Sequence, residues 1–250
     1  MISKSQVKYI QSLDQKKFRD QAGVFVAEGP KIINELLLEN SVHPLLLYAK
    51  EDWLKEQTGL IRNIPAEHII TVTTSELERI SFLSTPNSVT AIFRKPVFPE
   101  KVSFKNHLTV MLDGMQDPGN MGTFIRTADW FGISQIVCSP DCADAYAPKV
   151  VQSTMGSIAR VQLLYTSLAS ILDVEESVIA YGTTLGGEPL HGMKPLKEGI
   201  IVFGNESRGI SHEVLKLCGK QITIEKYGKA ESLNAAVASG IILSHLTRMA

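Results

Sequence analysis

The second half of the chain contains five short apolar runs separated by helical or loop segments, and this alternation limits the possible folds more than any other feature. The runs are LTVMLDG, QIVCSP, SVIAYGT, GIIVFGN and QITIEK, between residues 108 and 226. Near-continuous apolar character is typical of strands buried on both faces of a sheet, and such sheets are mostly parallel. We therefore predict a C-terminal α/β domain with a mostly parallel sheet, followed by a long helix within 231–249.

The first half shows the same alternation on a smaller scale. Four runs have strand character, at 24–29, 43–49, 68–73 and 89–93, and the segments 31–40 and 75–82 between them have helical spacing. This pattern predicts a small α/β sandwich.

The passage RKPVFPEKVSFKNH at 94–107 is rich in proline and lysine and lacks periodicity. It is therefore interpreted as an interdomain connection. The predicted domains are 1–95 and 107–250, joined by a linker at 96–106.

Composition narrows the class of protein. With 44% hydrophobic residues in 250, the chain can bury a substantial core, and a net charge of −1 argues against a protein that coats nucleic acid. The three cysteines form neither a disulfide framework nor a zinc motif, so no metal site is expected. Neither a signal peptide nor a membrane span is apparent, and we expect a cytoplasmic location.

Residues 1–19 are positively charged, because they contain five basic residues and one acidic residue. This stretch is either a solvated helix face or an arm that contacts phosphates. In the second case Lys16, Lys17 and Arg19 are the candidate RNA-binding residues.

Three polar, glycine-rich loops follow strands of the second half: DGMQDPGNMG, GNESRG and YGKAESLN. In a parallel α/β sheet, ligands bind where strands end and loops begin. We therefore expect the three loops to share one site.

The first loop leads into a helix with an apolar stripe. Asn120 is either the N-cap of this helix or a site residue. Gly122 indicates close approach of another backbone or a ligand. Arg126 lies off the stripe and is suited to bind an anion such as phosphate.

The other two loops offer further polar candidates. Glu206 is either part of a solvated turn or a pocket carboxylate partnered by Arg126 or Arg208. Ser232 and Asn234 stand at the start of the last helix, but two residues so close together cannot both cap it.

Taken together, these loops resemble the three ordered motifs of the SpoU/TrmH family. The matching residues are Asn120, Gly122 and Arg126, then Gly204, Glu206 and Gly209, then the run from Ile224 through Gly228 to Asn234. The resemblance covers residues 105–250. It implies an S-adenosylmethionine-dependent RNA ribose 2'-O-methyltransferase of the SPOUT class, a deep trefoil knot, and a homodimer in which the partner contributes to each active site.

The resemblance also implies roles for individual residues. The catalytic cluster would comprise Asn120, Arg126, Glu206, Ser232 and Asn234. The cofactor contacts would comprise Thr183, Gly204, Asn205, Ile224 and Leu233. This chain departs from the family in IEKYGKAESLN, which lacks the usual proline and methionine.

The stretch at 18–37 is similar to the ribosomal-protein-like substrate-binding domain of one branch of the family. That similarity favours structured ribosomal RNA over transfer RNA as the substrate.

The resemblance and the residue chemistry together give a hypothesis for the reaction. The three loops contain no histidine to act as a base, and arginine stays protonated. Arg126 would bind the phosphate beside the target ribose and stabilise the developing alkoxide, while Glu206 orients Arg126 and Asn120. Ser232 and Asn234 would hold the ribose.

Two other classes of protein are alternatives to the enzyme. A dehydrogenase fits the alternation, but the chain has no G-x-G-x-x-G after the first strand of either half. A non-catalytic RNA-binding or ribosome-assembly factor with the same fold remains the alternative. Binding of S-adenosylmethionine separates the enzyme from both.

Overall fold

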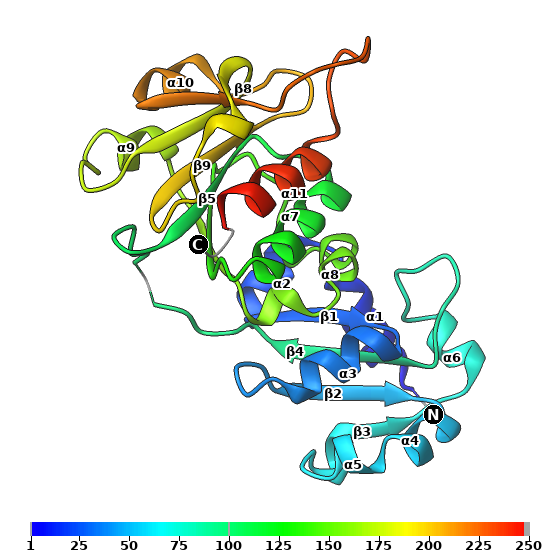
Figure 1. Ribbon diagram of the computed structural model, residues 1–250. Helices are drawn as coiled ribbons and strands as arrows, with labels where there is room; N and C mark the ends of the chain where they lie inside the picture. The colour runs from blue at the N-terminus through cyan, green and yellow to red at the C-terminus, as the bar shows by residue number, and fades with distance from the viewer. Residues whose placement is uncertain (1, 100, 248–250) are drawn as a thin grey trace. The chain divides into compact units, whose positions relative to one another are not determined.

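The computed structural model describes residues 2–99 and 101–247, which form two compact units. The first contains the chain up to Phe98 together with Asp144–Arg160, and the second contains Pro99–Ala143 and the chain from Val161 onward. Figure 1 labels their helices and strands. Residues 144–160 thus pack with the first unit, although they lie inside the range 107–250 that the sequence predicts as one domain.

The first unit is built on a four-stranded sheet of order β1-β4-β2-β3. β4 pairs antiparallel with β1 and β2, whereas β2 and β3 are parallel. The strands are β1 (Val24–Glu28), β2 (Pro44–Ala49), β3 (Ile69–Thr71) and β4 (Val89–Arg94), and they fall on the four predicted runs.

The helices of this unit begin at recognisable signals. Ser3 and Thr73 cap α1 and α6 in capping boxes, and Pro30 opens α3 directly after Gly29. The helices are α1 (Lys4–Ser12), α2 (Lys16–Ala22), α3 (Pro30–Leu38), α4 (Glu51–Glu56), α5 (Thr58–Ile61), α6 (Thr74–Glu78) and α8 (Pro148–Thr154), with 3-10 turns η1 (Ala66–His68) and η2 (Ser157–Ala159). One core joins α1, α6 and the sheet through Ile10, Leu77 and Val26.

The second unit contains a six-stranded sheet of order β10-β8-β9-β5-β6-β7, in which every pair is parallel. Its strands are β5 (Leu108–Asp113), β6 (Gln135–Cys138), β7 (Gln162–Tyr165), β8 (Ala180–Pro189), β9 (Gly199–Gly204) and β10 (Lys220–Thr223). The parallel sheet is confirmed. The sequence did not predict β7, an edge strand that is only half-buried and therefore lacks a strong apolar run.

Helices cover both faces of this sheet. They are α7 (Pro118–Trp130), α9 (Leu168–Leu172), α10 (His212–Leu217) and α11 (Ala235–Leu246), with the 3-10 turn η3 (Leu190–Gly192). Val214 of α10 shares a core with Val202, whereas the neighbouring Phe203 meets Phe124 of α7 edge-on at 5.1 Å. Because successive strand side chains alternate between faces, α7 and α10 lie on opposite sides of the sheet.

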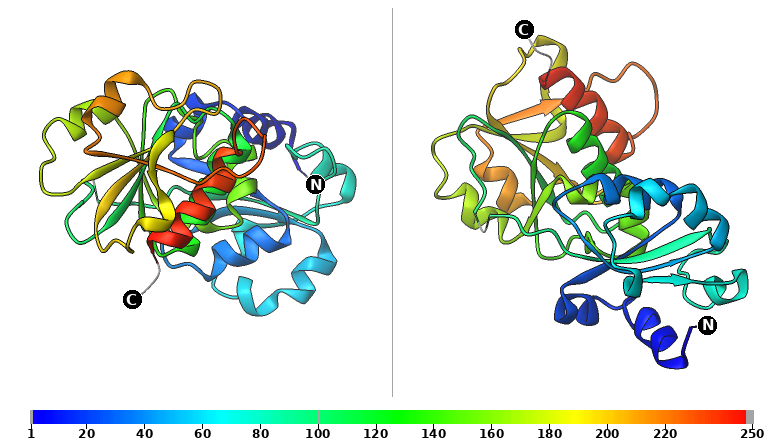
Figure 2. Two further views of the ribbon diagram at one scale, coloured as in Figure 1. Left: turned by 45° about the horizontal axis from the view of Figure 1, so that its top comes forward. Right: turned by 90° about the horizontal axis from the view of Figure 1, so that it is seen from below.

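The last helix, α11, packs beside α7, as both Figure 1 and Figure 2 show. The predicted stripe of α7 is confirmed, since Met121, Phe124, Ile125 and Ala128 are all buried. Among the described helices, none has the length and apolar character needed to cross a membrane.

Candidate active site

The three polar loops follow β5, β9 and β10, whose carboxyl ends lie at one edge of the second unit's sheet. A cavity of about 690 Å³ opens there. Its walls are the loops after β9 and β10, the stretch 183–185 of β8, and Ala238 and Ile242 of α11. This volume falls in the range of small-molecule sites, roughly 300–1,000 Å³.

Asn120 belongs to a network at the rim of this cavity. The N-cap of α7 is Asp117, whose Oδ1 accepts a 2.7 Å bond from the Asn120 backbone N–H, so Asn120 is not the cap. Its side chain is used elsewhere: Nδ2 donates to Glu206 Oε1 at 2.7 Å, and Oδ1 accepts from Asn234 Nδ2 at 3.0 Å. The amide therefore joins the loops after β5, β9 and β10.

Glu206 lines the cavity and is exposed, so the rim carries a carboxylate held by an amide. Asn234 caps α11 by accepting from the backbone N–H groups of Ala236 and Val237. Ser232 lines the cavity two residues earlier. The capping question raised by the sequence is thus settled in favour of Asn234, and the Ser232 hydroxyl is not used as a cap.

The loop after β9 closes tightly on itself. Asn205 and Gly209 exchange two backbone hydrogen bonds of 3.0 and 2.8 Å, and Asn205 Nδ2 donates to the Gly114 carbonyl at 2.8 Å. A Cβ on Gly204 would lie 2.1 Å from the backbone carbon of Gly209. Only glycine fits at position 204 because the returning chain occupies the space of a side chain.

The remaining predicted cofactor contacts also lie at the cavity. Thr183, Ile224 and Leu233 all line it, from β8 and from the loop after β10. Thr183 Oγ1 donates to the Val202 carbonyl at 2.9 Å, which holds β8 against β9 at the cavity wall. The structure therefore brings together all five predicted cofactor contacts.

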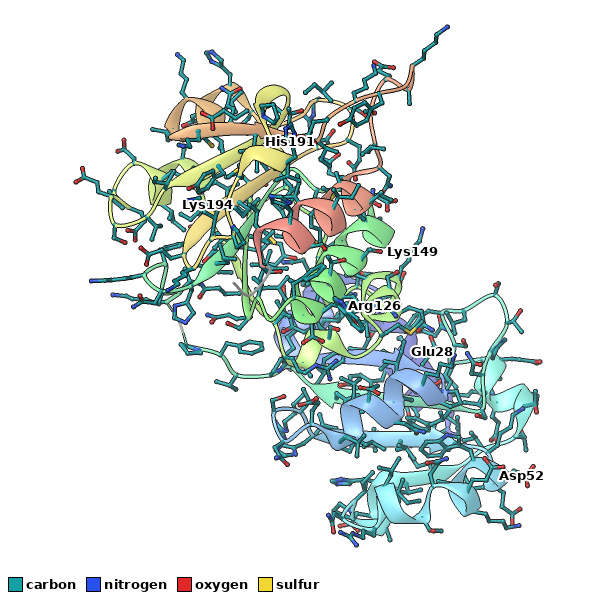
Figure 3. All side chains as sticks on the ribbon, in the orientation of Figure 1. Glu28, Asp52, Arg126, Lys149, His191 and Lys194 are labelled. Carbon is teal, nitrogen blue, oxygen red and sulfur yellow. The ribbon has the colours of Figure 1, made fainter. Side chains whose placement is uncertain are left out.

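Arg126 is the predicted catalytic residue that the structure does not bring into the cluster. It lies further along α7 than Asn120, is exposed, and is not among the residues that line the cavity. Figure 3 labels it on α7. The Glu206 carboxylate accepts from the Asn120 amide, and among the described residues no bond between Glu206 and Arg126 is found. The orienting role of Glu206 stays a prediction.

The predicted RNA-binding residues divide into two kinds. Lys16 and Lys17 are exposed, and Lys16 pairs with Asp20 at 3.6 Å. Arg19 is 2% exposed, and its guanidinium donates to the carbonyls of Leu13 and Asp14 at 2.7 and 2.6 Å.

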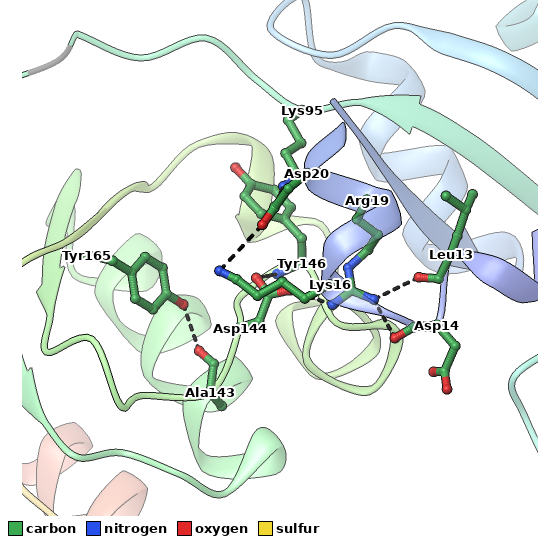
Figure 4. Close-up of polar contacts among 10 residues, drawn as sticks. All are labelled: Leu13, Asp14, Lys16, Arg19, Asp20, Lys95, Ala143, Asp144, Tyr146 and Tyr165. Atoms are coloured by element: carbon green, nitrogen blue, oxygen red, sulfur yellow. Dashed lines mark hydrogen bonds and ion pairs between the residues drawn. The ribbon is translucent and has the colours of Figure 1, made fainter. Parts of the chain in front are cut away.

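Arg19 also pairs with Asp144, as Figure 4 shows. The prediction that Arg19 contacts RNA is therefore wrong. Its charge is buried and paired inside the first unit, so the side chain cannot reach a phosphate.

Sequence reasoning missed two residues that shape the loops. Asp113 Oδ2 accepts from the Ser211 backbone N–H at 2.7 Å and so fixes the loop after β9. Glu225 lines the cavity, and the backbone N–H of His191 holds its carboxylate at 2.9 Å, which lowers the pKa of Glu225 to about 2. A carboxylate at the end of a buried strand was the available signal for Asp113, whereas the His191 contact left no signal in the sequence.

Two family models match the chain. The SpoU rRNA Methylase family matches residues 107–244, and the MRM3-like substrate binding domain matches residues 4–91. The chain is 30% identical over 244 residues to the 23S rRNA (guanosine(2553)-2'-O)-methyltransferase RlmP of Bacillus subtilis, covering 96% of this chain and 95% of that protein.

Solved structures agree with this match. A TrmH-family protein from Porphyromonas gingivalis has 35% identity and a TM-score of 0.84, with 98% of both chains covered. The SpoU methyltransferase AviRb from Streptomyces viridochromogenes, in complex with AdoMet, has 25% identity and a TM-score of 0.83, with 98% of this chain and 97% of that chain covered.

Proposed function

The chain belongs to the SpoU rRNA Methylase family, and on that premise we propose that it transfers the methyl group of S-adenosylmethionine to a ribose 2'-hydroxyl of structured RNA, ribosomal RNA in particular. The observation that carries the proposal is the Asn120–Glu206–Asn234 network at the rim of the second unit's cavity. The printed names of RlmP and of a Streptomyces viridochromogenes relative, a 23S rRNA (uridine(2479)-2'-O)-methyltransferase, support ribosomal RNA as the substrate class.

The cavity fits the methyl donor. Its walls combine apolar side chains such as Leu185 and Ile242 with the backbone of two loops, which suits a ligand that has both an adenine ring and polar ends. Gly204, Asn205, Ile224, Leu233 and Thr183 would hold it, largely through backbone groups. When bound, S-adenosylmethionine supplies the electrophilic methyl group.

The acceptor site lies at the rim network in this proposal. Glu206 holds the Asn120 amide in place, and Asn234 holds its other end, so the network is fixed before RNA arrives. Such preorganised donors stabilise charge that develops in a transition state. Ser232 and Asn234 would hold the reacting ribose beside the donor.

Arg126 would complete a neighbouring site rather than its own. It is exposed on α7, four residues before Trp130, which is 83% exposed. Val237 of α11, the helix that packs beside α7, is 54% exposed. Apolar surface of this kind favours an interface. We therefore assign the protein as a homodimer in which Arg126 of the partner subunit binds the phosphate beside the target ribose and stabilises the alkoxide.

Residues 1–95 would bind the RNA and serve as the substrate-binding domain, joined by a linker at 96–106 to the methyltransferase domain at 107–250. The match of the first unit to the MRM3-like substrate binding domain and its four-stranded sheet support a ribosomal-protein-like fold. Lys16 and Lys17 would hold the RNA backbone through charge, which gives position and not sequence choice. We also propose a cytoplasmic location, because free cysteines are typical of proteins in a reducing compartment.

We include the trefoil knot in the proposal. The segment that follows β8 holds the end of α11: the Leu196 backbone N–H donates to the Leu246 carbonyl, and His245 Nε2 donates to the Met193 carbonyl, both at 2.8 Å. These bonds hold the end of the last helix against an earlier segment of the chain, which is the kind of contact that a knotted topology requires. Such threading is rare among protein folds.

Two measurements test the proposal. Calorimetry should detect binding of S-adenosylmethionine to the full chain, and mapping of 2'-O-methyl groups in total RNA with and without the gene should reveal a missing ribosomal methyl group. A protein that does not bind the donor would be the non-catalytic RNA-binding or assembly factor instead.

A further inference from the structure

The first unit contains a second pocket, of about 200 Å³. It is lined by Val26 and Glu28 of β1, by Phe82 and Leu83 of the loop before β4, and by α8. Figure 3 labels Glu28 and Lys149, which come from β1 and α8. We refer to it as the Glu28 pocket. Its volume suits a group the size of one nucleobase and excludes a whole nucleotide cofactor.

Glu28 gives the pocket its chemical character. Its side chain is a buried carboxylate, 4% exposed, whose Oε2 accepts from Ser81 Oγ at 2.5 Å and whose Oε1 accepts from the Phe82 backbone N–H at 2.8 Å. Among the residues that the structure describes, no cation pairs with it. A carboxylate offers about four lone-pair positions, so these two bonds leave about one acceptor position on each oxygen.

A buried carboxylate without a cation is unfavourable unless donors surround it. The bonds to Ser81 and Phe82 hold the 81–83 loop and offset part of the cost of burying the Glu28 carboxylate. Each oxygen already has one donor, and a ligand that brings further N–H groups into the pocket would use the acceptor position that remains on each.

The other walls favour a flat, partly apolar ligand. Phe82, Val26, Leu83 and Pro148 provide an aromatic ring and aliphatic surface. Unpaired RNA bases are recognised by stacking on aromatic side chains and by hydrogen bonds to their edges. Lys149 lies at the pocket and can meet a backbone phosphate, because lysine binds phosphate as a point charge.

Among the bases, guanine alone has two adjacent N–H donors, N1–H and the 2-amino group, on its Watson–Crick edge. A carboxylate with two oxygens matches that pair of donors. Uracil and adenine each present an acceptor next to a single donor on the same edge.

We propose that the Glu28 pocket binds one unpaired guanine base of the RNA, with Glu28 accepting from its Watson–Crick edge and Phe82 stacking on its face. The pocket would thereby select where the substrate docks on the first unit. This inference rests on the proposed function for the presence of an RNA substrate, but it concerns a site separate from the methyl-donor cavity.

The test uses the full chain and fluorescently labelled RNA pentamers that differ only in the central base: UUGUU, UUIUU with inosine, UUAUU and UUUUU. Fluorescence anisotropy should show that UUGUU binds about tenfold or more tightly than UUUUU, the discrimination expected of a paired contact to a base edge. Inosine lacks the 2-amino group and should bind with intermediate affinity.

Variants assign the effect to the pocket. Glu28→Gln should abolish the preference for guanine, and the matched change Glu67→Gln, at an exposed glutamate outside the pocket, should preserve it. Lys149→Ala should weaken all pentamers alike and reduce the salt dependence of binding. Should Glu28→Gln not fold, Phe82→Leu provides the second variant. It should weaken binding of UUGUU, because the guanine loses the ring that stacks on its face, and unchanged affinity would overturn the assignment.

Failure of UUGUU to bind, or equal binding of UUGUU and UUUUU by the wild-type protein, would overturn the pocket assignment. Binding of S-adenosylmethionine, measured in the same preparation, reports on the other unit. A protein that binds the donor but shows no guanine preference refutes only this inference, and one that prefers guanine but does not bind the donor refutes only the proposed methyl transfer.

Discussion

Asn120 and Glu206, 86 residues apart in the chain, share a 2.7 Å hydrogen bond in which the Asn120 amide donates to the Glu206 carboxylate. Asn120 Oδ1 also accepts from Asn234, so one side chain joins three loops. The bond places an amide next to a carboxylate at the rim of the cavity that we assign to the methyl donor. Removing this hydrogen bond should slow methyl transfer and leave the affinity for the methyl donor nearly unchanged.

Asn120→Ala should lower the rate of methyl transfer by about 100-fold, a typical loss for one preorganised donor. The dissociation constant for S-adenosylmethionine should change little, because Asn120 does not line the cavity. Single-turnover kinetics and calorimetry measure the two quantities. Thr123→Ala, at an exposed position on the same helix, is the matched control. Wild-type rates in Asn120→Ala would remove the network from the mechanism.

Arg126→Ala should be inactive alone yet recover in mixed dimers with Gly204→Ala. In such a dimer the subunit that carries the Arg126→Ala change keeps an intact cavity, and Arg126 of the partner subunit can serve it, so one working site forms. Methyl transfer by co-expressed, doubly tagged dimers measures this recovery. Inactive mixed dimers would show that Arg126 acts within its own chain.

Gly204→Ala should abolish donor binding. Its Cβ would overlap the backbone at Gly209 and Ile210, at 2.1 and 2.2 Å, so the loop after β9 cannot keep its conformation. Gly192→Ala is the control, because an added Cβ there meets nothing within 4 Å. Calorimetric titration with S-adenosylmethionine compares the two. Unaltered affinity in Gly204→Ala would mean that the donor does not depend on this loop.

Asp144→Asn should lower the free energy of unfolding by about 3 kcal/mol, because it leaves the buried charge of Arg19 unpaired. The double change Arg19→Met with Asp144→Leu should lose much less, since it removes both charges. Urea denaturation measures each. Lys55→Ala, which breaks the exposed pair with Glu51, should remain close to the wild type. A wild-type-like Asp144→Asn protein would contradict a structural role for the pair.

Glu28 should make stability depend on pH. Burial raises the pKa of its carboxyl above 4.5, so the folded protein holds this proton more tightly than the unfolded chain does. The contribution is fully present below pH 4.5 and is lost as the pH rises through the folded-state pKa. Urea denaturation at a series of pH values measures the free energy of unfolding, which should fall as the pH rises through the pKa of Glu28. Glu28→Gln should remove this fall, and Glu67→Gln should retain it. The same pH dependence of the free energy of unfolding in wild type and Glu28→Gln would contradict a contribution from Glu28.

Local features could be predicted from the sequence. Strand runs, the stripe of α7 and the order of the three loops all follow from the spacing and type of neighbouring residues, and a parallel sheet brings the ends of its strands to one edge. These features located the cavity, and the family resemblance of the loops predicted Gly204, Asn205, Ile224 and Leu233 at its wall. The half-buried edge strand β7 was missed because its run is short and mixed.

Which polar groups are buried, and which partners they take, depends on how distant segments pack. Arg19 looked like a phosphate contact because its neighbours are basic, yet Asp144, 125 residues later, pairs with it and buries it. The sequence left Asn120 open as N-cap or site residue, and the structure gives the cap to Asp117. Arg126 does not line the cavity. The spacing of apolar residues along the sequence reports on one helix or strand at a time. It therefore cannot show which distant segments pack together and which polar groups they bury.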